Sequence, residues 1–300
     1  MGTKKNGKRN RKQRYKCISC RHQWGGEKAL HDWVQKAYEK YAIERQTLQN
    51  LSASYGKSKK TIRKYFDRYD AVVGEIIVPQ KPINLVLDAT FFHRSEGVLI
   101  ARGNGRNILW REIKTESIAV YDSLLDDLIA AGFQFLSCTI DGRRGVLRLL
   151  ESKFQYLKIQ LCQFHQVQIV TRYLSTRPKL PAGKELRCLT LTLSKIDRKT
   201  FTENLLKWRE KWNNFLQEKT INPNSKRWAY THRRIRSAYR SLKTNLPWLF
   251  TYQDFPRLHI PNTTNSCDGS FAHWKNKLKI HRGLSENRKR KMLHFFLEHT

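Results

Sequence analysis

Acidic residues are scarce in this sequence, whose 300 residues include 25 Asp and Glu but 58 Lys and Arg, for a formal net charge of +33. Net charge reports on partners rather than on fold, so we expect a polyanionic partner, and nucleic acid is the simplest one. A membrane-surface or ribosome-associated basic protein is the alternative. Long apolar runs are also missing, and none reaches the length that spans a bilayer, so we expect no membrane partner.

The sequence also lacks a disulfide framework and a nucleotide-binding glycine loop. Its six cysteines are scattered along the chain, which favours a reducing cytoplasm. No apolar signal core follows the basic residues 4–9. Without a glycine loop to cradle phosphates, an ATP-driven enzyme is not expected.

Cys17 and Cys20 form a single Cys-x-x-Cys knuckle in a basic tail, residues 1–26. A zinc ribbon needs four ligands, and the only further candidate nearby is His22. Three interpretations stay open. The chain has lost half of a ribbon, the remaining zinc ligands come from elsewhere, or the two thiols bind no metal.

Residues 27–72 have the pattern of a helix-turn-helix domain. Apolar residues recur at helical spacing over 27–46, a further helix ends at Gly56, and Ser58 caps the helix after it. In this motif the helix after the turn enters the major groove of DNA. An ordinary helical hairpin with a solvated basic face is the alternative. The residues expected to contact phosphates and bases are Lys57, Lys59, Lys60, Arg63 and Lys64.

Two apolar strands, each closed by an aspartate, follow a proline-containing linker at residues 72–82. The first strand leads into Asp88 and the second into Asp141. A carboxylate where an apolar strand emerges is costly to place unless a cation lies beside it. Two strands that deliver carboxylates to the same edge of one sheet would build a divalent-metal site.

The order of elements over residues 80–170 predicts a mixed sheet in an α/β domain. Three antiparallel strands followed by two crossover units is the order of a ribonuclease H-like core. The first and fourth strands are neighbours in that order, which places Asp88 beside Asp141. The expected strands are 83–88, 98–102, 108–113, 135–141 and 156–161, and the expected helices are 116–131 and 143–153.

Residues 171–260 look like a helical insertion in this core. Arg233, Arg236 and Arg240 share one helical face there and are expected to track a DNA backbone. A tryptophan-rich core with a solvated arginine face is the alternative.

Residues 261–300 are expected to return to the core as its C-terminal helix. Polar residues 262–265 are suited to cap a helix over 267–280. Asp268 falls in the first turn of that helix, where the helix dipole favours an anion, so an ordinary N-terminal helix acid is the alternative to a ligand.

Four motifs in this order resemble the Mutator-like DDE transposases of bacterial insertion sequences. The first two are Asp88 in Leu-Asp-Ala-Thr and Asp141 in Ile-Asp-Gly. The third is the Cys-x-x-His pair Cys162 and His165, and the fourth surrounds Asp268 in residues 263–271. The resemblance covers roughly residues 80–300 and extends through 275–279 and 281–285. The family usually has Glu as its third acid, and Asp268 offers a carboxylate with a shorter reach.

The resemblance implies a metal-dependent DNA transposase with a ribonuclease H-like α/β fold, a helical insertion and an upstream helix-turn-helix domain. Asp88, Asp141 and Asp268 would hold two Mg²⁺ or Mn²⁺ ions for in-line displacement. The protein would bind the terminal inverted repeats of its element, cleave the ends and join the 3′-hydroxyl to target DNA. Lys275 would contact DNA, and Cys162, His165 and His281 would be structural or orienting residues.

Such a protein would work on double-stranded DNA at the nucleoid in the bacterial cytoplasm, and pairing two element ends implies a homodimer or a larger synaptic complex. Two alternatives stay open. One is a catalytically inactive DNA-binding regulator derived from a transposase. The other is a different ribonuclease H-like nuclease, such as a junction resolvase.

Overall fold

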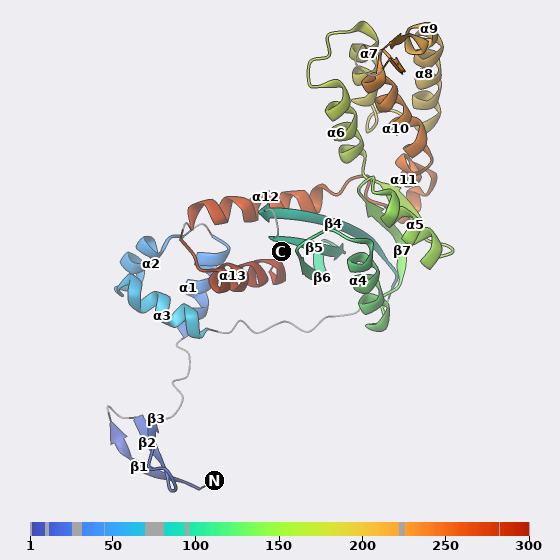
Figure 1. Cartoon of the computed structure of the whole chain (residues 1–300). Coiled ribbons are helices and arrows are strands. Elements are labelled where there is room, and N and C mark those ends of the chain that lie inside the picture. Colours follow the sequence, from blue (N-terminus) through green and yellow to red (C-terminus); the bar gives the residue numbers. More distant parts are fainter. Residues whose placement is uncertain are drawn as a thin grey trace. The chain divides into compact units, whose positions relative to one another are not determined.

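The structure is a computed structural model that describes residues 2–9, 12–25, 32–44, 46–69, 81–93, 96–221, 226–281 and 283–299 (Figure 1). The chain divides into two compact units. The first is Met1–Val73 with Lys277–Phe296, and the second is Gly74–Asn276 with Leu297–Thr300. Most of the expected linker at 72–82 lies outside the described residues. Within the described ranges, no helix has both the length and the apolar character needed to cross a membrane.

The N-terminal segment is a small antiparallel sheet, where the sequence led us to expect a basic tail. Its strands are β1 (Thr3–Arg9), β2 (Lys12–Cys17) and β3 (Gln23–Gly25), in the order β1-β2-β3. The register of β1 and β2 shifts beside Gly7, whose φ of +64° is a conformation that glycine adopts without strain. These strands escaped prediction because their charged sequence has no apolar alternation.

Three helices form the next part of the first unit: α1 (Asp32–Ala42), α2 (Leu48–Tyr55) and α3 (Lys59–Arg68). The predicted turn is present, with Gly56 in the left-handed conformation at the C-terminus of α2. The predicted cap is also present, because the Ser58 hydroxyl accepts a hydrogen bond from the Thr61 N–H.

The C-terminal helix α13 (Glu286–Glu298) contributes to the core of the first unit, although the sequence placed residues 261–300 with the sheet. The ring of Phe295 meets that of Tyr38 edge-on, with 5.0 Å between centroids. Arg288 donates from Nε and Nη2 to the two carboxylate oxygens of Asp67, each at 2.7 Å. This aromatic and ionic packing explains why residues 277–296 belong with α1–α3.

The second unit contains a five-stranded mixed sheet in the order β6-β5-β4-β7-β8. β4 (Ile83–His93), β5 (Glu96–Gly103) and β6 (Arg106–Ile113) are antiparallel, whereas β7 (Phe135–Ile140) and β8 (Lys158–Leu161) run parallel to β4. The crossover helices are α4 (Ile118–Ala130) and α5 (Arg144–Lys153). The predicted mixed sheet and the predicted adjacency of its first and fourth strands are therefore confirmed.

The two faces of β4 have different partners. Leu85 and Leu87 belong to the hydrophobic core that includes Leu124 of α4. Because successive strand residues point to opposite faces, Asp88 and Phe92 lie on the other face. There the ring of Phe92 meets that of Trp274, at 6.1 Å between centroids, and Trp274 lies on α12 (Asn265–Ile280).

Between β8 and α12 the chain is mainly helical, as predicted. A short antiparallel hairpin of β9 (Lys219–Ile221) and β10 (Trp228–Tyr230) was not predicted. The helical elements are α6 (Gln163–Leu174), α7 (Pro181–Thr190), α8 (Arg198–Lys211), α9 (Asn213–Gln217), α10 (Arg233–Leu249), α11 (Thr251–Asp254) and the 3-10 turn η1 (Pro256–Leu258).

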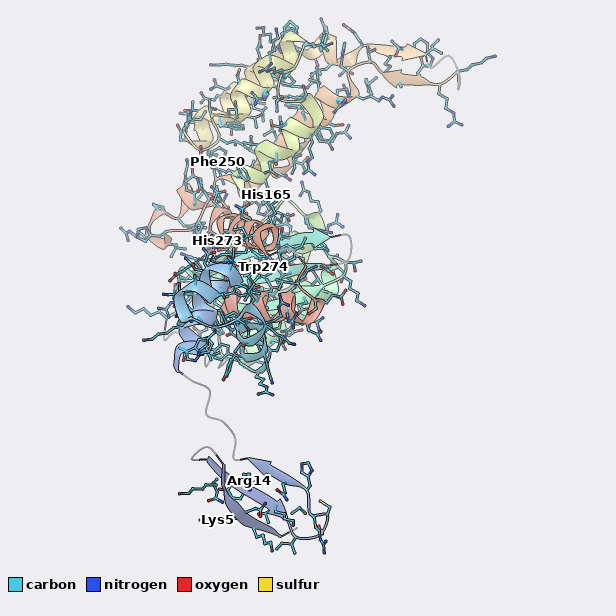
Figure 2. All side chains as sticks on the ribbon, turned by 90° about the vertical axis from the view of Figure 1, so that its left-hand side faces the viewer. Lys5, Arg14, His165, Phe250, His273 and Trp274 are labelled. Atoms are coloured by element: carbon cyan, nitrogen blue, oxygen red, sulfur yellow. The ribbon has the colours of Figure 1, made fainter. Side chains whose placement is uncertain are left out.

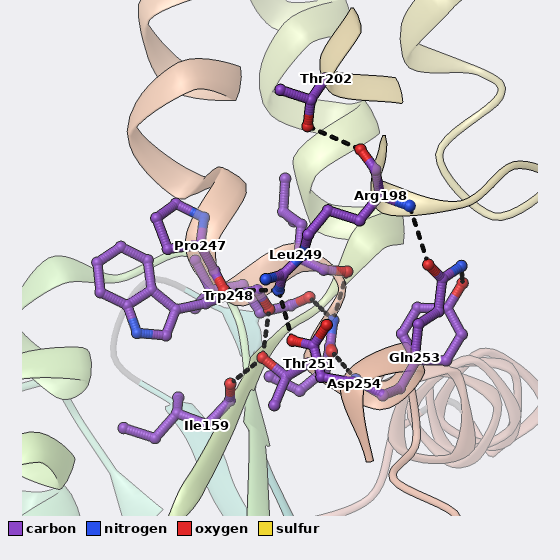
Figure 3. Close-up of polar contacts among 12 residues, drawn as sticks. Ile159, Arg198, Thr202, Pro247, Trp248, Leu249, Thr251, Gln253 and Asp254 are labelled. Carbon is purple, nitrogen blue, oxygen red and sulfur yellow. Dashed lines mark hydrogen bonds and ion pairs between the residues drawn. The ribbon is translucent and has the colours of Figure 1, made fainter. Parts of the chain in front are cut away.

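Polar contacts join α10 and α11 to β8, and further contacts join helices of this region to each other (Figure 3). The Thr251 hydroxyl donates to the Ile159 carbonyl at 2.7 Å, and the buried Gln160 amide donates to the Leu249 carbonyl at 2.9 Å. Arg198 pairs with Asp254 at 2.7 Å. These bonds fix α10 and α11 at the end of β8, from which α6 also starts.

Candidate functional site

Asp88 and Asp141 occupy equivalent positions on neighbouring parallel strands. Val86 of β4 is the register partner of Thr139 of β7, and each aspartate lies two residues further along its strand direction. Adjacent strands are about 4.8 Å apart, so the two acids lie close together. The strand order thus brings the two predicted acids side by side.

One detail of the prediction is wrong, because Asp88 does not end its strand. β4 continues to His93, with Asp88 opposite Ile100 of β5. Only β7 ends at this level, at Ile140, because the chain turns there into α5. Asp88 is therefore a buried mid-strand carboxylate, with 6% of its surface exposed, beside the open end of β7.

Backbone N–H groups orient both carboxylates. Asp88 Oδ1 accepts from the N–H of Ala89 at 2.9 Å, and Asp141 Oδ1 accepts from the N–H of Arg143 at 3.1 Å. Burial raises the pKa of Asp141, and the negative charge of Glu116 raises it further, against the hydrogen bond from Arg143 and the charge of His165. Asp141 is therefore a carboxylate whose ionised form is disfavoured.

Glu116, Tyr121 and Arg143 surround these acids and were missed by the sequence reasoning. The buried Tyr121 hydroxyl donates to Glu116 Oε1 at 2.6 Å, and Arg143 forms an ion pair with the same carboxylate. The pKa of Tyr121 is raised by burial, then by Glu116, and also by the charges of Asp141 and Asp88. The only sequence signal was the position of Arg143, two residues after Asp141.

Asp268 lies in α12, but its side chain is outside the described part of the structure. The helix that carries it is anchored on the same face as Asp88. Arg102 of β5 donates to the Ser270 hydroxyl at 3.2 Å. One turn further along α12 lies the buried Trp274, which is labelled in Figure 2, and its ring meets that of Phe92. Among the side chains that the structure describes, no three His, Cys, Asp or Glu groups are placed to hold a metal ion.

The segment that leads into α12 is bonded to the ends of β7 and β8. The Thr139 hydroxyl donates to the Pro261 carbonyl at 2.7 Å. The Asn262 carbonyl accepts from the Gln163 N–H at 3.0 Å, and their side-chain amides are joined at 3.1 Å. These bonds set the start of α12 against the strand ends where Asp141 lies.

Cys162 and His165 support this connection. The N–H of Thr264 donates to the buried Cys162 sulfur at 3.3 Å, and the Thr264 hydroxyl lies 3.3 Å from His165 Nδ1. Burial opposes ionisation of Cys162, but hydrogen bonds from His165 and Thr264 outweigh it and lower the pKa of the thiol. The charge of His165 also lowers the pKa of Asp141.

The predicted DNA contacts of the first unit lie on and beside α3. Lys59, Lys60, Arg63 and Lys64 are exposed, opposite the buried Ile62 and Phe66. Lys57 is half-buried because its ammonium lies 5.4 Å from the ring centre of Trp33.

The other predicted site residues differ in how exposed they are. Arg233, Arg240 and Lys275 are exposed, whereas Arg236 is half-buried and stacks 3.5 Å from the ring centre of Tyr230. His281 is buried in the first unit against Tyr41, with 4.2 Å between ring centroids. Burial and the charge of Lys277 lower the pKa of His281, which makes it a core residue of that unit.

Cys17 and Cys20 bracket a tight turn between β2 and β3. The Cys17 N–H donates to the His22 carbonyl at 2.8 Å. Hydrogen bonds from the Cys20 backbone and from the Ser19 hydroxyl lower the pKa of the Cys17 thiol to about 7. A lowered thiol pKa suits a metal ligand, but the described side chains supply no complete ligand set for zinc.

The chain matches no protein-family model, and no curated protein is significantly similar to it. The features of this chain that bear on function are therefore its carboxylates, the sheet that positions them and its basic surfaces.

Proposed function

We propose that this chain is a metal-dependent DNA transposase of the DDE type. The observation that carries the proposal is the register of β4 and β7, which sets Asp88 beside Asp141 on the sheet face that contacts α12. Asp268 lies on that helix and is the third acid of the proposal. Three antiparallel strands followed by two parallel ones support a ribonuclease H-like assignment of the sheet.

The residues present fit a hard divalent cation. Asp88 and Asp141 offer carboxylate oxygens, which Mg²⁺ and Mn²⁺ prefer. Burial and the charge of Glu116 disfavour the ionised form of Asp141, and a cation at this place would offset both effects. When bound, such ions would stabilise the attacking and leaving oxygens of an in-line phosphoryl displacement.

The surrounding residues position the acids. The N–H groups of Ala89 and Arg143 each hold one oxygen of Asp88 and Asp141. Arg143 forms an ion pair with Glu116, and the Tyr121 hydroxyl donates a hydrogen bond to Glu116. Because both partners occupy the Glu116 carboxylate, we assign Glu116 a supporting role and keep Asp268 as the third metal ligand. Thr264, Cys162 and His165 set where α12 begins.

The first unit would supply the recognition of DNA ends. The turn at Gly56 and the cap at Ser58 support a helix-turn-helix, with α3 as the helix that enters the major groove. Its exposed basic residues would contact phosphates and base edges of double-stranded DNA. Synapsis of two ends would need a homodimer or a larger assembly at the bacterial nucleoid.

Binding of Mn²⁺ to the purified chain, followed by the electron paramagnetic resonance of the free ion, tests the metal site. The wild type is expected to bind Mn²⁺, and Asp88→Asn and Asp141→Asn are each expected to weaken binding at least tenfold. Unchanged binding in both variants would remove the basis of the proposal.

Incubation with DNA that carries the native flanks of the gene then distinguishes a transposase from the two alternatives, a DNA-binding regulator and a different ribonuclease H-like nuclease. Specific binding with no cleavage in Mg²⁺ or Mn²⁺ would identify a DNA-binding regulator. Cutting of branched DNA without preference for the flanks would identify a structure-specific nuclease.

A further inference from the structure

A groove in the helical region of the second unit has a strongly basic lining. It encloses about 480 Å³ and is bordered by α8, α9 and α10, and we call it the α10 groove. Its volume is in the range of sites that hold small ligands. Its lining residues are Arg209, Leu216, Arg236, Tyr239, Arg240, Lys243 and Thr244.

Among the residues that the structure describes, the cations of the α10 groove have no acidic partner. Arg236, Arg240 and Lys243 recur at spacings of three and four, so they form one stripe on α10. The sequence of α10 contains no Asp or Glu. Across the described residues, no carboxylate lies within ion-pair distance of these three side chains or of Arg209. Like charges this close disfavour the helix, and an anionic ligand in the groove would offset that repulsion.

Neutral partners hold two of the guanidinium groups in place. Arg209 donates to Asn213 Oδ1 at 2.6 Å, and Arg236 donates to the Leu216 carbonyl at 2.5 Å. Arg236 also stacks on Tyr230. These contacts fix the side chains without neutralising them, and each guanidinium keeps further N–H donors for an oxyanion.

We propose that the α10 groove binds the sugar-phosphate backbone of a nucleic-acid strand, separately from the contacts of α3. The stripe from Arg236 to Lys243 is about 10 Å long at 1.5 Å per residue, which matches roughly three steps along the axis of a DNA duplex at 3.4 Å each. Arginine suits bidentate recognition of phosphate oxygens. The inference goes beyond catalysis, because binding does not require the carboxylates or a metal.

The test is equilibrium binding of fluorescent oligonucleotides of random sequence, single-stranded and duplex, to the full chain in EDTA over a series of salt concentrations. Arg240→Gln with Lys243→Gln is the groove variant, since both side chains are exposed. Lys184→Gln with Lys207→Gln is the matched control. It removes the same charge from exposed residues of α7 and α8 that do not line the groove.

We expect the groove variant to bind about tenfold or more weakly at 0.1 M salt, with a salt slope smaller by about 1.4 for single strands or 1.8 for duplex. The control variant is expected to keep the wild-type slope. Exchanging the cations, as Arg240→Lys with Lys243→Arg, is expected to restore most of the binding.

Equal losses in the groove and control variants would mean a non-specific charge effect and would overturn the proposal, as would no loss in either. The probe whose binding is weakened more by the groove variant, single-stranded or duplex, identifies which of the two the groove binds. Because EDTA removes divalent metal, this assay measures binding without cleavage. Its outcome therefore does not depend on whether the chain is a metal-dependent transposase.

Discussion

Asp88 and Asp141 lie at the same level of two neighbouring parallel strands, each two residues beyond the register pair Val86 and Thr139. One is buried within β4 and the other follows the last residue of β7. Their proximity follows from strand order and register, so it depends on backbone pairing rather than on flexible side chains. The raised pKa of Asp141 shows the cost of a carboxylate in this place.

Asp141→Asn is expected to stabilise the folded chain at neutral pH. The raised pKa means that the folded state binds the Asp141 proton more tightly than the unfolded state does. This favourable contribution is complete below the unfolded pKa and is lost as pH rises through the folded one. Urea unfolding at several pH values should therefore show a gain for the variant at pH 7 that disappears near pH 3. A variant less stable than wild type at pH 7 would contradict this account of the site.

Mg²⁺ is expected to stabilise the wild-type chain but not Asp141→Asn. A ligand that binds only the folded state adds about 2.7 kcal/mol when present at one hundred times its dissociation constant. Thermal unfolding with and without Mg²⁺ measures the difference. An equal shift in both proteins would place the ion elsewhere.

Thr264→Val is expected to lower the free energy of unfolding by about 1 kcal/mol. The change keeps the shape of the side chain but removes the hydroxyl that lies beside Cys162 and His165. Thr263→Val is the matched control on the neighbouring residue and should stay within about 0.5 kcal/mol of wild type. Urea unfolding of both variants decides whether the Thr264 contacts or the general polarity of the segment matters.

The sheet could be predicted from the sequence because its strands and turns have local sequence signals. The apolar runs before Asp88 and Asp141 marked β4 and β7, and Asn104-Gly105 marked the hairpin between β5 and β6. The support for Asp141 could not be predicted in the same way. Glu116 and Arg143 are 27 residues apart and meet only through the fold.

The N-terminal sheet and the role of α13 were missed for related reasons. The strand β1 is rich in lysine and shows no alternation to mark it. Phe295 and Tyr38 come from opposite ends of the sequence, and nothing local indicates that they pack together. Long-range packing of this kind becomes visible only in the structure.

Phe295→Ala is expected to destabilise the first unit by about 3–5 kcal/mol, the usual cost of removing a buried aromatic ring. Phe295 is 3% exposed and contacts Tyr38 and Tyr69. Hydrogen exchange should show lost protection in α1–α3 with protection retained in β4 and β7. The exposed Asn287 on the same helix gives the control Asn287→Ala, which should leave exchange unchanged. Protected α1–α3 peptides in Phe295→Ala would show that α13 is dispensable for this unit.

Alkylation of Cys17 by iodoacetamide is expected to have its half-maximal rate near pH 7. Hydrogen bonds from the Cys20 backbone and from the Ser19 hydroxyl stabilise the thiolate. Ser19→Ala removes one of these donors and should move the midpoint to higher pH. Mass spectrometry of the Cys17 peptide measures the rate, and an identical profile in the variant would show that Ser19 has no part in the shift.

Strand transfer tests the central claim most directly. Labelled DNA carrying the native flanks of the gene would be incubated with purified protein, plasmid target and Mg²⁺ or Mn²⁺. The account predicts joined products with the wild type and a loss of at least about a hundredfold in Asp88→Asn, Asp141→Asn and Asp268→Asn. Full joining by Asp88→Asn or Asp141→Asn would contradict the account. Joining that survives only in Asp268→Asn would mean that another acid is the third ligand.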